Sequence, residues 1–418
     1  MQNDNIFRYR ARFIIPAYGQ HIENGVLTIA DGQVRSVDRY NGEPAEDLGD
    51  VAIVPGFVNA HTHLDLPKLD WPVQGFHHFA DWLKNVIGQR LQIAPDELPD
   101  LIEDNIREVR QGGAVAVGDI ATTAVSQEVL KASGLYGVAF REVLGLLETR
   151  FDPLWQAALS QLHHSVASTQ ERQKVTVGLS PHAPYSTSPI VYRRCESLPI
   201  GISLATHWFE SFDEIKLLKN GSGRLFEFLR DLNAIPTEEG GARFTELSDP
   251  FEELLSTPGA NRWILNHGNF LTPAHIDRMS EPAWRKRIAG VVYCPRTHSR
   301  FAYPPHPWRE LLDRGMTVGL GTDSLSTNPD LSIHEEAKFL AARFPEVPAQ
   351  TLLAMLTQHG ADLLQLGDKF SGLFVGAKAT ATIIRSDFSK QSDPLRAIFS
   401  PDAAVAAIML DGALHQIV

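Results

Sequence analysis

The sequence predicts an α/β protein: a (β/α)8 TIM-like barrel with a small β-sandwich-like domain formed from both termini. Three observations predict this fold class: β-prone stretches at both ends, eight apolar strand-like runs between them, and amphipathic segments of helical period that separate the runs. The 418 residues suffice for one large barrel and an accessory unit. We expect residues 1–55 and 367–418 to form the small domain, and residues 56–366 to form the barrel.

The terminal stretches are short, apolar and separated by turn residues. Asp31-Gly32 lies between two such stretches and predicts a β-hairpin, and Asp411-Gly412 is a similar turn signal near the other end. Because both ends have the same character, we expect them to share one sheet. The stretches are residues 11–15, 25–29, 33–37, 377–384 and 403–410.

The middle of the chain alternates apolar runs with amphipathic segments, which implies parallel strands joined by helices. Eight such units over about 310 residues fit a closed barrel with insertions. A doubly wound open sheet is the rival fold, but no GxGxxG turn follows the first run. The apolar runs are residues 51–60, 114–120, 137–143, 175–179, 202–205, 263–265, 291–294 and 317–321.

The composition excludes several classes of protein. A net charge of -12 argues against a nucleic-acid partner, because phosphate binding needs clustered Lys and Arg. The only two cysteines, Cys195 and Cys294, offer neither a disulfide framework nor a thiolate metal site. No signal-peptide core and no apolar run of roughly 20 residues is present, so we expect a cytoplasmic protein without a membrane partner. The oligomeric state stays open, and a homo-oligomer is allowed.

Polar residues with metal-binding side chains fall where the predicted strands end. In a barrel of this kind the carboxyl ends of all strands meet at one mouth, where the chemistry takes place. A lone histidine is usually structural, but several such residues at separate strand ends are much harder to ascribe to chance. The residues concerned are His61, His63, His182, His207, His267 and Asp323.

The spacing of His61 and His63 favours a shared metal ion. Side chains alternate along an extended chain, so two histidines separated by one residue lie on the same side of the strand. A third imidazole and a carboxylate complete a nitrogen and oxygen ligand set that Zn²⁺ or Fe²⁺ accepts, with a position left for water.

Four motifs resemble those of the amidohydrolase superfamily, and in particular its branch of base and nucleoside deaminases. The resemblance covers nearly the whole chain and is most specific in the first and third motifs. The motifs are Pro-Gly-Phe-Val-Asn-Ala-His-Thr-His at 55–63, Pro-His-Ala-Pro-Tyr-Ser at 181–186, Thr-His-Trp-Phe-Glu-Ser at 206–211 and Gly-Thr-Asp-Ser at 321–324.

This resemblance implies roles for individual residues. His61, His63, His207 and Asp323 correspond to the metal ligands, Glu210 to a proton shuttle, His267 to a histidine beside the reacting group, and His182 to a substrate contact. Binuclear members of the superfamily carry a carboxylated lysine at the end of strand 4. Here Lys174 precedes that strand, so we expect a single metal ion, with Zn²⁺ favoured and Fe²⁺ suited to the same ligands.

The implied reaction is hydrolytic deamination of a small molecule. Asp323 is expected to act as ligand and base, Glu210 to protonate a ring nitrogen, and His267 to hydrogen-bond the attacking oxygen. The substrate is expected to be an amino-substituted purine or pyrimidine base or nucleoside. Motifs around Trp82 and after Asp323 are similar to those of aminodeoxyfutalosine deaminases, and others to those of methylthioadenosine/S-adenosylhomocysteine deaminases.

Three further residues are candidates for substrate binding. Trp82 lies in the motif Phe-Ala-Asp-Trp-Leu, and Arg296 and His298 follow strand 7 at the predicted mouth, where they suit an anionic or polar group. A loop that packs through its own polar contacts is the competing interpretation for Arg296 and His298.

Two other functions stay open from the sequence alone. A triazine-type or cyclic-amide hydrolase of the same superfamily would use the same metal site and Glu210. A metal-free scaffold or binding protein is the alternative of another class, although here every ligand position is filled.

Overall fold

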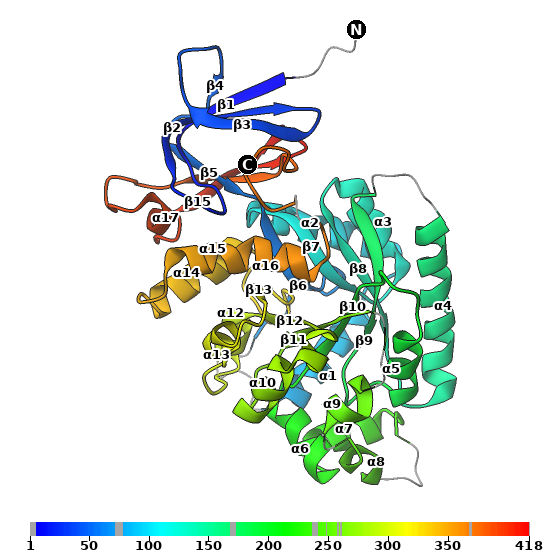
Figure 1. Ribbon diagram of the computed structural model, residues 1–418. Coiled ribbons are helices and arrows are strands. Elements are labelled where there is room, and N and C mark those ends of the chain that lie inside the picture. Colours follow the sequence, from blue (N-terminus) through cyan, green and yellow to red (C-terminus); the bar gives the residue numbers. More distant parts are fainter. Residues whose placement is uncertain are drawn as a thin grey trace.

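The computed structural model describes residues 6–71, 78–167, 173–235, 241–247, 249–256, 259, 261–367 and 370–417. Within these residues the strands form two separate sheets, one parallel and one mainly antiparallel. The parallel sheet and its helices make up the larger body of the molecule, and the second sheet lies at one end of it (Figure 1).

The parallel sheet contains eight strands that follow one another in chain order, from β6 to β13. An isolated parallel bridge between Thr62 and Asp323 links the first strand to the segment after the last. This arrangement confirms the predicted (β/α)8 barrel. The strands are β6 (Phe57–Thr62), β7 (Ala114–Ala121), β8 (Tyr136–Val143), β9 (Val175–Pro181), β10 (Leu204–Trp208), β11 (Trp263–His267), β12 (Ile288–Tyr293) and β13 (Val318–Leu320).

Helices cover the outside of the barrel, so the barrel strands are buried on both faces. Every residue of β7 and β8 is buried, which explains their continuous runs of apolar residues. The helices are α1 (Phe79–Arg90), α2 (Leu98–Gln111), α3 (Ala124–Ser133), α4 (Glu148–Ala167), α5 (Pro189–Glu196), α6 (Phe212–Asn220), α7 (Arg224–Asp231), α8 (Ala242–Thr245), α9 (Pro250–Leu255), α10 (Pro273–Ser280), α11 (Pro282–Arg285), α12 (Pro295–Arg300), α13 (Trp308–Asp313), α14 (Ile333–Arg343), α15 (Ala349–Leu356), α16 (Gln358–Leu363) and α17 (Pro394–Ala397).

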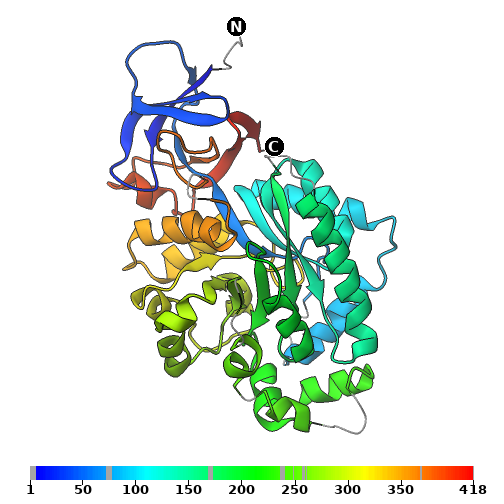
Figure 2. The same ribbon diagram turned by 45° about the vertical axis from the view of Figure 1, so that its right-hand side comes forward.

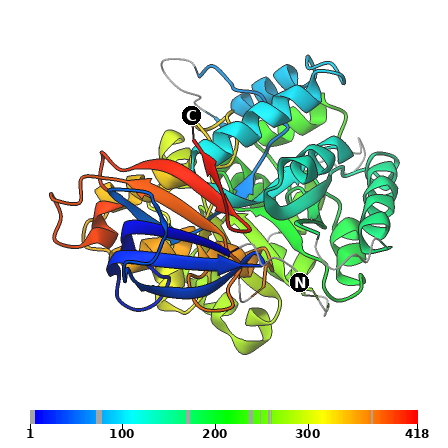
Figure 3. The same cartoon turned by 90° about the horizontal axis from the view of Figure 1, so that it is seen from above.

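The second sheet combines strands from both ends of the chain, as the sequence predicts. Its order is β16-β15-β14-β5-β1-β2-β3, with β4 paired to β1. Seen from above, strands from the two ends of the chain lie together in one sheet, in which β5 pairs with β14 (Figure 3). The strands are β1 (Ile6–Ile14), β2 (Ile22–Ala30), β3 (Gln33–Arg39), β4 (Glu46–Asp47), β5 (Val51–Pro55), β14 (Ala381–Arg385), β15 (Ala404–Leu410) and β16 (Ala413–Gln416).

Both predicted Asp-Gly turns are hairpin turns in the structure. Asp31 and Gly32 join β2 to β3, and Asp411 and Gly412 join β15 to β16. All four residues have positive φ, which is the backbone conformation that a two-residue turn between twisted strands requires.

The first apolar run is two strands rather than the single strand that the sequence predicts. Val51–Pro55 pairs with β1 and β14 in the terminal sheet, and Phe57–Thr62 enters the barrel. Gly56 separates them where the chain packs tightly: a Cβ there would lie 2.4 Å from Val115 Cγ2. We propose that the boundaries between the small domain and the barrel lie after residue 55 and after residue 366.

The carboxyl ends of the barrel strands point away from the terminal sheet. That sheet lies at one end of the molecule and α6, α7 and α8 lie at the other (Figures 1 and 2). In the part of the chain that the structure describes, no helix is both long and apolar enough to span a membrane.

Replacing Gly56 by alanine should lower the free energy of unfolding by about 1–3 kcal/mol, because the added methyl group overlaps Val115 and the two strands must shift. Gly88→Ala is the matched control. Gly88 lies in α1 with no atom within 4 Å of an added Cβ, so the change should leave stability unchanged or raise it by about 0.5–1 kcal/mol. Urea unfolding of both variants measures this; equal effects would contradict the tight junction.

Candidate metal centre and active site

Three histidines from two barrel strands meet at the mouth of the barrel. His61 lies in β6, His63 follows directly after it, and His207 lies in β10. One ring nitrogen from each of these residues lies within 4.8 Å of the others, and His63 Nε2 and His207 Nε2 are 3.2 Å apart. The structure therefore brings together residues that are up to 146 positions apart in the chain.

Asp323 and His267 complete the cluster. Asp323 Oδ1 lies 3.8 Å from His61 Nε2 and 3.7 Å from His63 Nε2. His267, the last residue of β11, lies with its ring centroid 5.0 Å from that of His61 and 5.3 Å from that of His207. All five side chains are buried.

These residues fit a divalent cation because their own hydrogen bonds leave ring nitrogens without a partner. Both ring nitrogens of His61 and Nε2 of His267 are buried and form no hydrogen bond with the described residues. Orphaned buried polar groups cost about 1–3 kcal/mol each, which a bound cation would offset. Three imidazoles and one carboxylate are a suitable donor set for one such ion.

The electrostatics of the cluster also suit a cation. Burial lowers the pKa of His61, His63 and His267 well below the usual value, and the neighbouring histidines lower it further. Burial lowers the pKa of His207 to about 4. The rings are therefore neutral near pH 7, which is the form that binds metals.

The orientation of His207 is fixed by a backbone contact. Its Nδ1 donates a hydrogen bond to the carbonyl of His182 at 2.9 Å, so the proton lies on Nδ1 and Nε2 is free to act as a ligand. Lys174 lies just before β9, at the opposite end from this cluster, and its ammonium pairs with Asp411 at 2.6 Å. No lysine in the described part of the chain is therefore placed at the end of β9 to bridge two ions, and the cluster fits a single one.

Asp323 is held in a strained backbone conformation. Its φ is +58°, in the left-handed region that costs a non-glycine residue about 1–3 kcal/mol. Hydrogen bonds on both sides stabilise this geometry: the Thr62 hydroxyl donates to the Asp323 carbonyl at 2.8 Å, and the Thr327 hydroxyl donates to Oδ2 at 2.9 Å. Oδ1 is thereby directed towards the histidines.

Glu210 lies beside the cluster, three residues after His207 in the chain. Its Oε1 is 3.6 Å from His267 Nε2. Burial raises the pKa of Glu210 well above the usual value, and the nearby Asp323 and Glu214 raise it further. The backbone here is anchored, because Asn269 donates to the Glu210 carbonyl and the Glu210 amide donates to Glu214, both at 2.8 Å. A fixed carboxyl group with a raised pKa can carry and deliver a proton.

A cavity of about 710 Å³ opens above these groups. His63, His207, Glu210 and Asp323 all line it, so a small molecule in the cavity can reach the cluster. Such a volume lies within the range of small-molecule binding sites.

Two of the predicted substrate residues also line this cavity. Trp82 lies on α1, and its indole Nε1 donates to the Ser326 carbonyl at 3.1 Å, which leaves the ring to form part of the wall. His182 follows β9 and directs Nε2 towards Glu142, 3.9 Å away.

The structure does not bring Arg296 and His298 to the cavity, and neither is among the described residues that line it. The Arg296 guanidinium pairs with Asp330 and with the fully buried Glu336, each at 2.7 Å. His298 contacts the Pro304 carbonyl through Nε2 at 2.8 Å. These contacts favour the competing interpretation of a loop that packs through its own polar groups, and the role in substrate binding stays an untested prediction.

Two residues of the cavity were not singled out from the sequence. Glu142, near the end of β8, is buried and lines the cavity, and Tyr185 lines it with a buried hydroxyl that has no partner among the described residues. A signal for Glu142 is present in the sequence, because Arg141 and Glu142 interrupt an otherwise apolar run close to its carboxyl end. Tyr185 lies within the motif at 181–186 that resembles deaminases, in which the resemblance gives a role to His182 alone.

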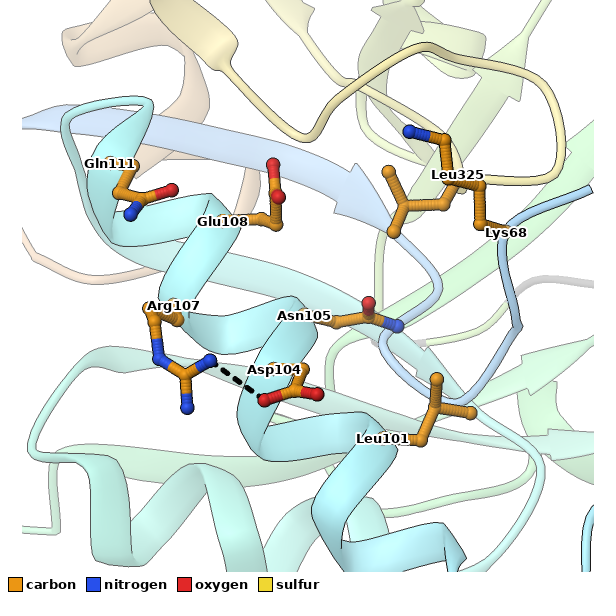
Figure 4. Close-up of a pocket in the computed structure, with 8 residues that line it drawn as sticks. All are labelled: Lys68, Leu101, Asp104, Asn105, Arg107, Glu108, Gln111 and Leu325. Carbon is orange, nitrogen blue, oxygen red and sulfur yellow. Dashed lines mark hydrogen bonds and ion pairs between the residues drawn. The ribbon is translucent and has the colours of Figure 1, made fainter.

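A smaller pocket of about 390 Å³ lies over the outer face of α2 (Figure 4). Arg107 and Asp104 pair with each other at 2.8 Å, and Asn105 donates to the Leu64 carbonyl. None of its described lining residues is a histidine. The candidate site residues His63, His182, His207, Glu210 and Asp323 line the large cavity and not this pocket.

Comparisons with known proteins find similarity along most of the chain. The profile of the amidohydrolase family matches residues 52–414. An aminodeoxyfutalosine deaminase of Deinococcus radiodurans is 26% identical over 80% of this chain and 79% of its own length. A 5-methylthioadenosine/S-adenosylhomocysteine deaminase of Nitratidesulfovibrio vulgaris is 27% identical over 82% of this chain and 75% of its own length.

Solved structures show the same fold. An aminofutalosine deaminase of Helicobacter pylori in complex with methylthio-coformycin aligns with a TM-score of 0.77 and 20% identity, over 98% of this chain and 100% of the other. An adenosine deaminase of Xanthomonas campestris with bound zinc aligns with a TM-score of 0.73 and 21% identity, over 98% of this chain and 92% of the other.

Replacing Arg296 by methionine should lower the free energy of unfolding by about 3–5 kcal/mol, because the buried Glu336 carboxylate would lose its cationic partner. Arg309→Met is the control: Arg309 pairs with Glu346 at the surface, and its loss should change stability by about 0–1 kcal/mol. Thermal and urea unfolding compare the two. If Arg296→Met instead keeps full stability and only raises KM, the residue binds substrate and the structural assignment is wrong.

Proposed function

The chain belongs to the amidohydrolase family, whose profile covers most of its length, and on this premise we propose that it is a metal-dependent hydrolytic deaminase. The substrate is an amino-substituted purine or pyrimidine, as the free base or the nucleoside. One observation carries the proposal: three imidazoles and a carboxylate converge on one point, with the carboxyl group of Glu210, whose pKa is raised by burial, next to them.

We assign the metal-ligand role to His61, His63, His207 and Asp323. When bound, a divalent cation supplies Lewis-acid chemistry and lowers the pKa of water enough to make hydroxide available near neutral pH. Zn²⁺ is the preferred ion, because it accepts this mixed nitrogen and oxygen set and because the adenosine deaminase of similar fold binds zinc.

The residues around the reacting carbon divide the proton transfers between them. Asp323, whose Oδ1 lies beside His61 and His63, accepts a proton from the attacking water and passes it to the exocyclic amino group that leaves. Glu210 delivers its proton to the ring nitrogen next to that carbon, so the tetrahedral carbon forms without a full negative charge. His267 presents Nε2 to the attacking oxygen. One water is consumed, the exocyclic carbon–nitrogen bond breaks, ammonia leaves, and a ring carbonyl remains.

Glu210→Gln should keep the metal content and fold while lowering kcat by about 10²–10⁴-fold, because glutamine fills the same volume but cannot transfer a proton. Glu227→Gln, at an exposed position of α7 outside the cavity, is the control and should retain full activity. Metal analysis and ammonia release are measured for both. A Glu210→Gln variant with undiminished turnover would falsify the role of Glu210.

Removing the metal with a chelator should abolish turnover, and one divalent ion per chain should restore it, because the four proposed ligands surround one point. The assay is ammonia release from adenosine, methylthioadenosine, S-adenosylhomocysteine, aminodeoxyfutalosine and a set of free aminopurines and aminopyrimidines. Metal dependence without ammonia from any of these compounds would favour hydrolysis of another carbon–nitrogen bond and reject the deaminase.

A further inference from the structure

The direction of the His267 ring is set by its backbone, because no hydrogen bond holds Nε2. His267 and Gly268 both have positive φ, +67° and +66°, at the point where β11 ends. Nε2 of His267 is buried, forms no hydrogen bond with the described residues and lies 3.6 Å from Glu210 Oε1. A residue with a side chain is strained in this left-handed conformation, so neighbouring contacts must hold it. The position of Nε2 therefore depends on what fixes the turn after β11.

Two contacts with neighbouring segments hold this turn. The Gly268 amide donates to the Trp208 carbonyl in β10 at 2.8 Å. His306 contacts the His267 carbonyl through Nε2, also at 2.8 Å. Burial lowers the pKa of His306 to about 3, so its ring is neutral near pH 7 and has a single N–H. Because a carbonyl only accepts hydrogen bonds, that N–H lies on Nε2 and donates to His267.

His306 is itself held in one position by the chain around it. It lies in the run Pro-Pro-His-Pro at 304–307, and each proline fixes its own φ. The His306 ring stacks on Tyr293, with centroids 3.9 Å apart and planes 18° from parallel. His298 Nε2 contacts the Pro304 carbonyl at 2.8 Å, and the Tyr293 hydroxyl lies 3.5 Å from His298 Nδ1. The N–H of His306 therefore has a defined direction.

Packing alone does not account for a histidine at position 306. Its Nδ1 is buried and has no partner among the described residues, and the side chain is not part of the described cavity lining. An apolar side chain would fill the same space without an unsatisfied nitrogen, whose burial costs free energy. The bond to the His267 carbonyl is what the imidazole adds at this position.

We propose that His306 is a positioning residue, which holds the backbone of His267 so that Nε2 faces Glu210 and the reacting group. The expected effect on turnover rests on the proposed deaminase function, whereas the effect on the position of His267 does not depend on the reaction. Tyr293 and His298 support the segment that carries His306.

His306→Phe and His306→Gln separate the hydrogen bond from the packing. Phenylalanine keeps a ring against Tyr293 but has no donor, and glutamine keeps an N–H close to the place of Nε2. We expect His306→Phe to lower kcat by about 10–100-fold with KM and metal content unchanged, because a displacement of about 1 Å in an active site can cost this much. His306→Gln should restore most of the lost kcat.

His334→Phe is the matched control. His334 is also buried, and its Nε2 contacts the Ile398 carbonyl at 2.6 Å, away from the described cavity lining. Loss of a buried hydrogen bond should lower the melting temperature of both phenylalanine variants, but only His306→Phe should lose turnover. Full kcat in His306→Phe, or an equal loss of kcat in His334→Phe, would overturn the positioning role. If His306→Phe does not fold, His306→Leu replaces it with the same expectations.

Crystal structures separate failure of this inference from failure of the deaminase proposal. His267 Nε2 lies 3.6 Å from Glu210 Oε1 in the unchanged protein, and we expect His306→Phe to alter this distance by roughly 1 Å. Such a displacement in a protein that releases no ammonia from any compound would support the inference while the deaminase proposal fails. An unchanged distance together with an unchanged φ of His267 would overturn the inference, whatever the turnover.

Discussion

Closure of the barrel between its first and last strands is the constraint on which the site depends. Thr62 and Asp323 are 261 residues apart, yet they form a parallel bridge, and the backbone amides of Thr322 and Asp323 both donate to the His61 carbonyl. This contact places the carboxylate of Asp323 against the imidazoles of β6. The backbone of Asp323 takes a left-handed conformation there. The strained backbone of a proposed metal ligand therefore lies where the first and last strands of the barrel meet.

The cluster is destabilising by itself and is supported by contacts one layer further out. Neutral imidazoles with unpartnered nitrogens are buried together, and a cation bound among them would offset part of the cost of their burial. Around them the His182 carbonyl fixes the proton of His207, and Thr327 orients Asp323. Glu336 accepts from both Arg296 and Asn328, and Asn328 also donates to the Thr322 carbonyl next to Asp323. Arg296 therefore helps to hold Asp323 in place indirectly, through the loop after β13.

The sequence predicts the barrel and the cluster because both follow from periodic patterns. Apolar runs that end in histidine or aspartate reveal strand ends, and the barrel topology requires those ends to meet. The split of the first run at Gly56 is not predictable in this way, since β5 and β6 are both fully buried and differ only in which sheet they join. Arg296 was assigned to the mouth by position alone, and a position at a strand end does not reveal that Asp330 and Glu336 already engage the guanidinium. Tyr185 belongs to the motif at 181–186, but its place in the cavity depends on the path of a loop, which no periodic pattern predicts.

The cavity wall is built from two different parts of the fold, and this separates chemistry from selectivity. The proposed ligands and Glu210 lie at or just after strand ends, whose positions are fixed by the hydrogen-bond register of the barrel. The wall also includes side chains of α1, α4 and α7, which the barrel register does not constrain. A substitution on these helices can reshape the cavity while the distances among His61, His63 and His207 stay the same. The helices, and not the strands, are therefore where differences in substrate among proteins of this fold should arise.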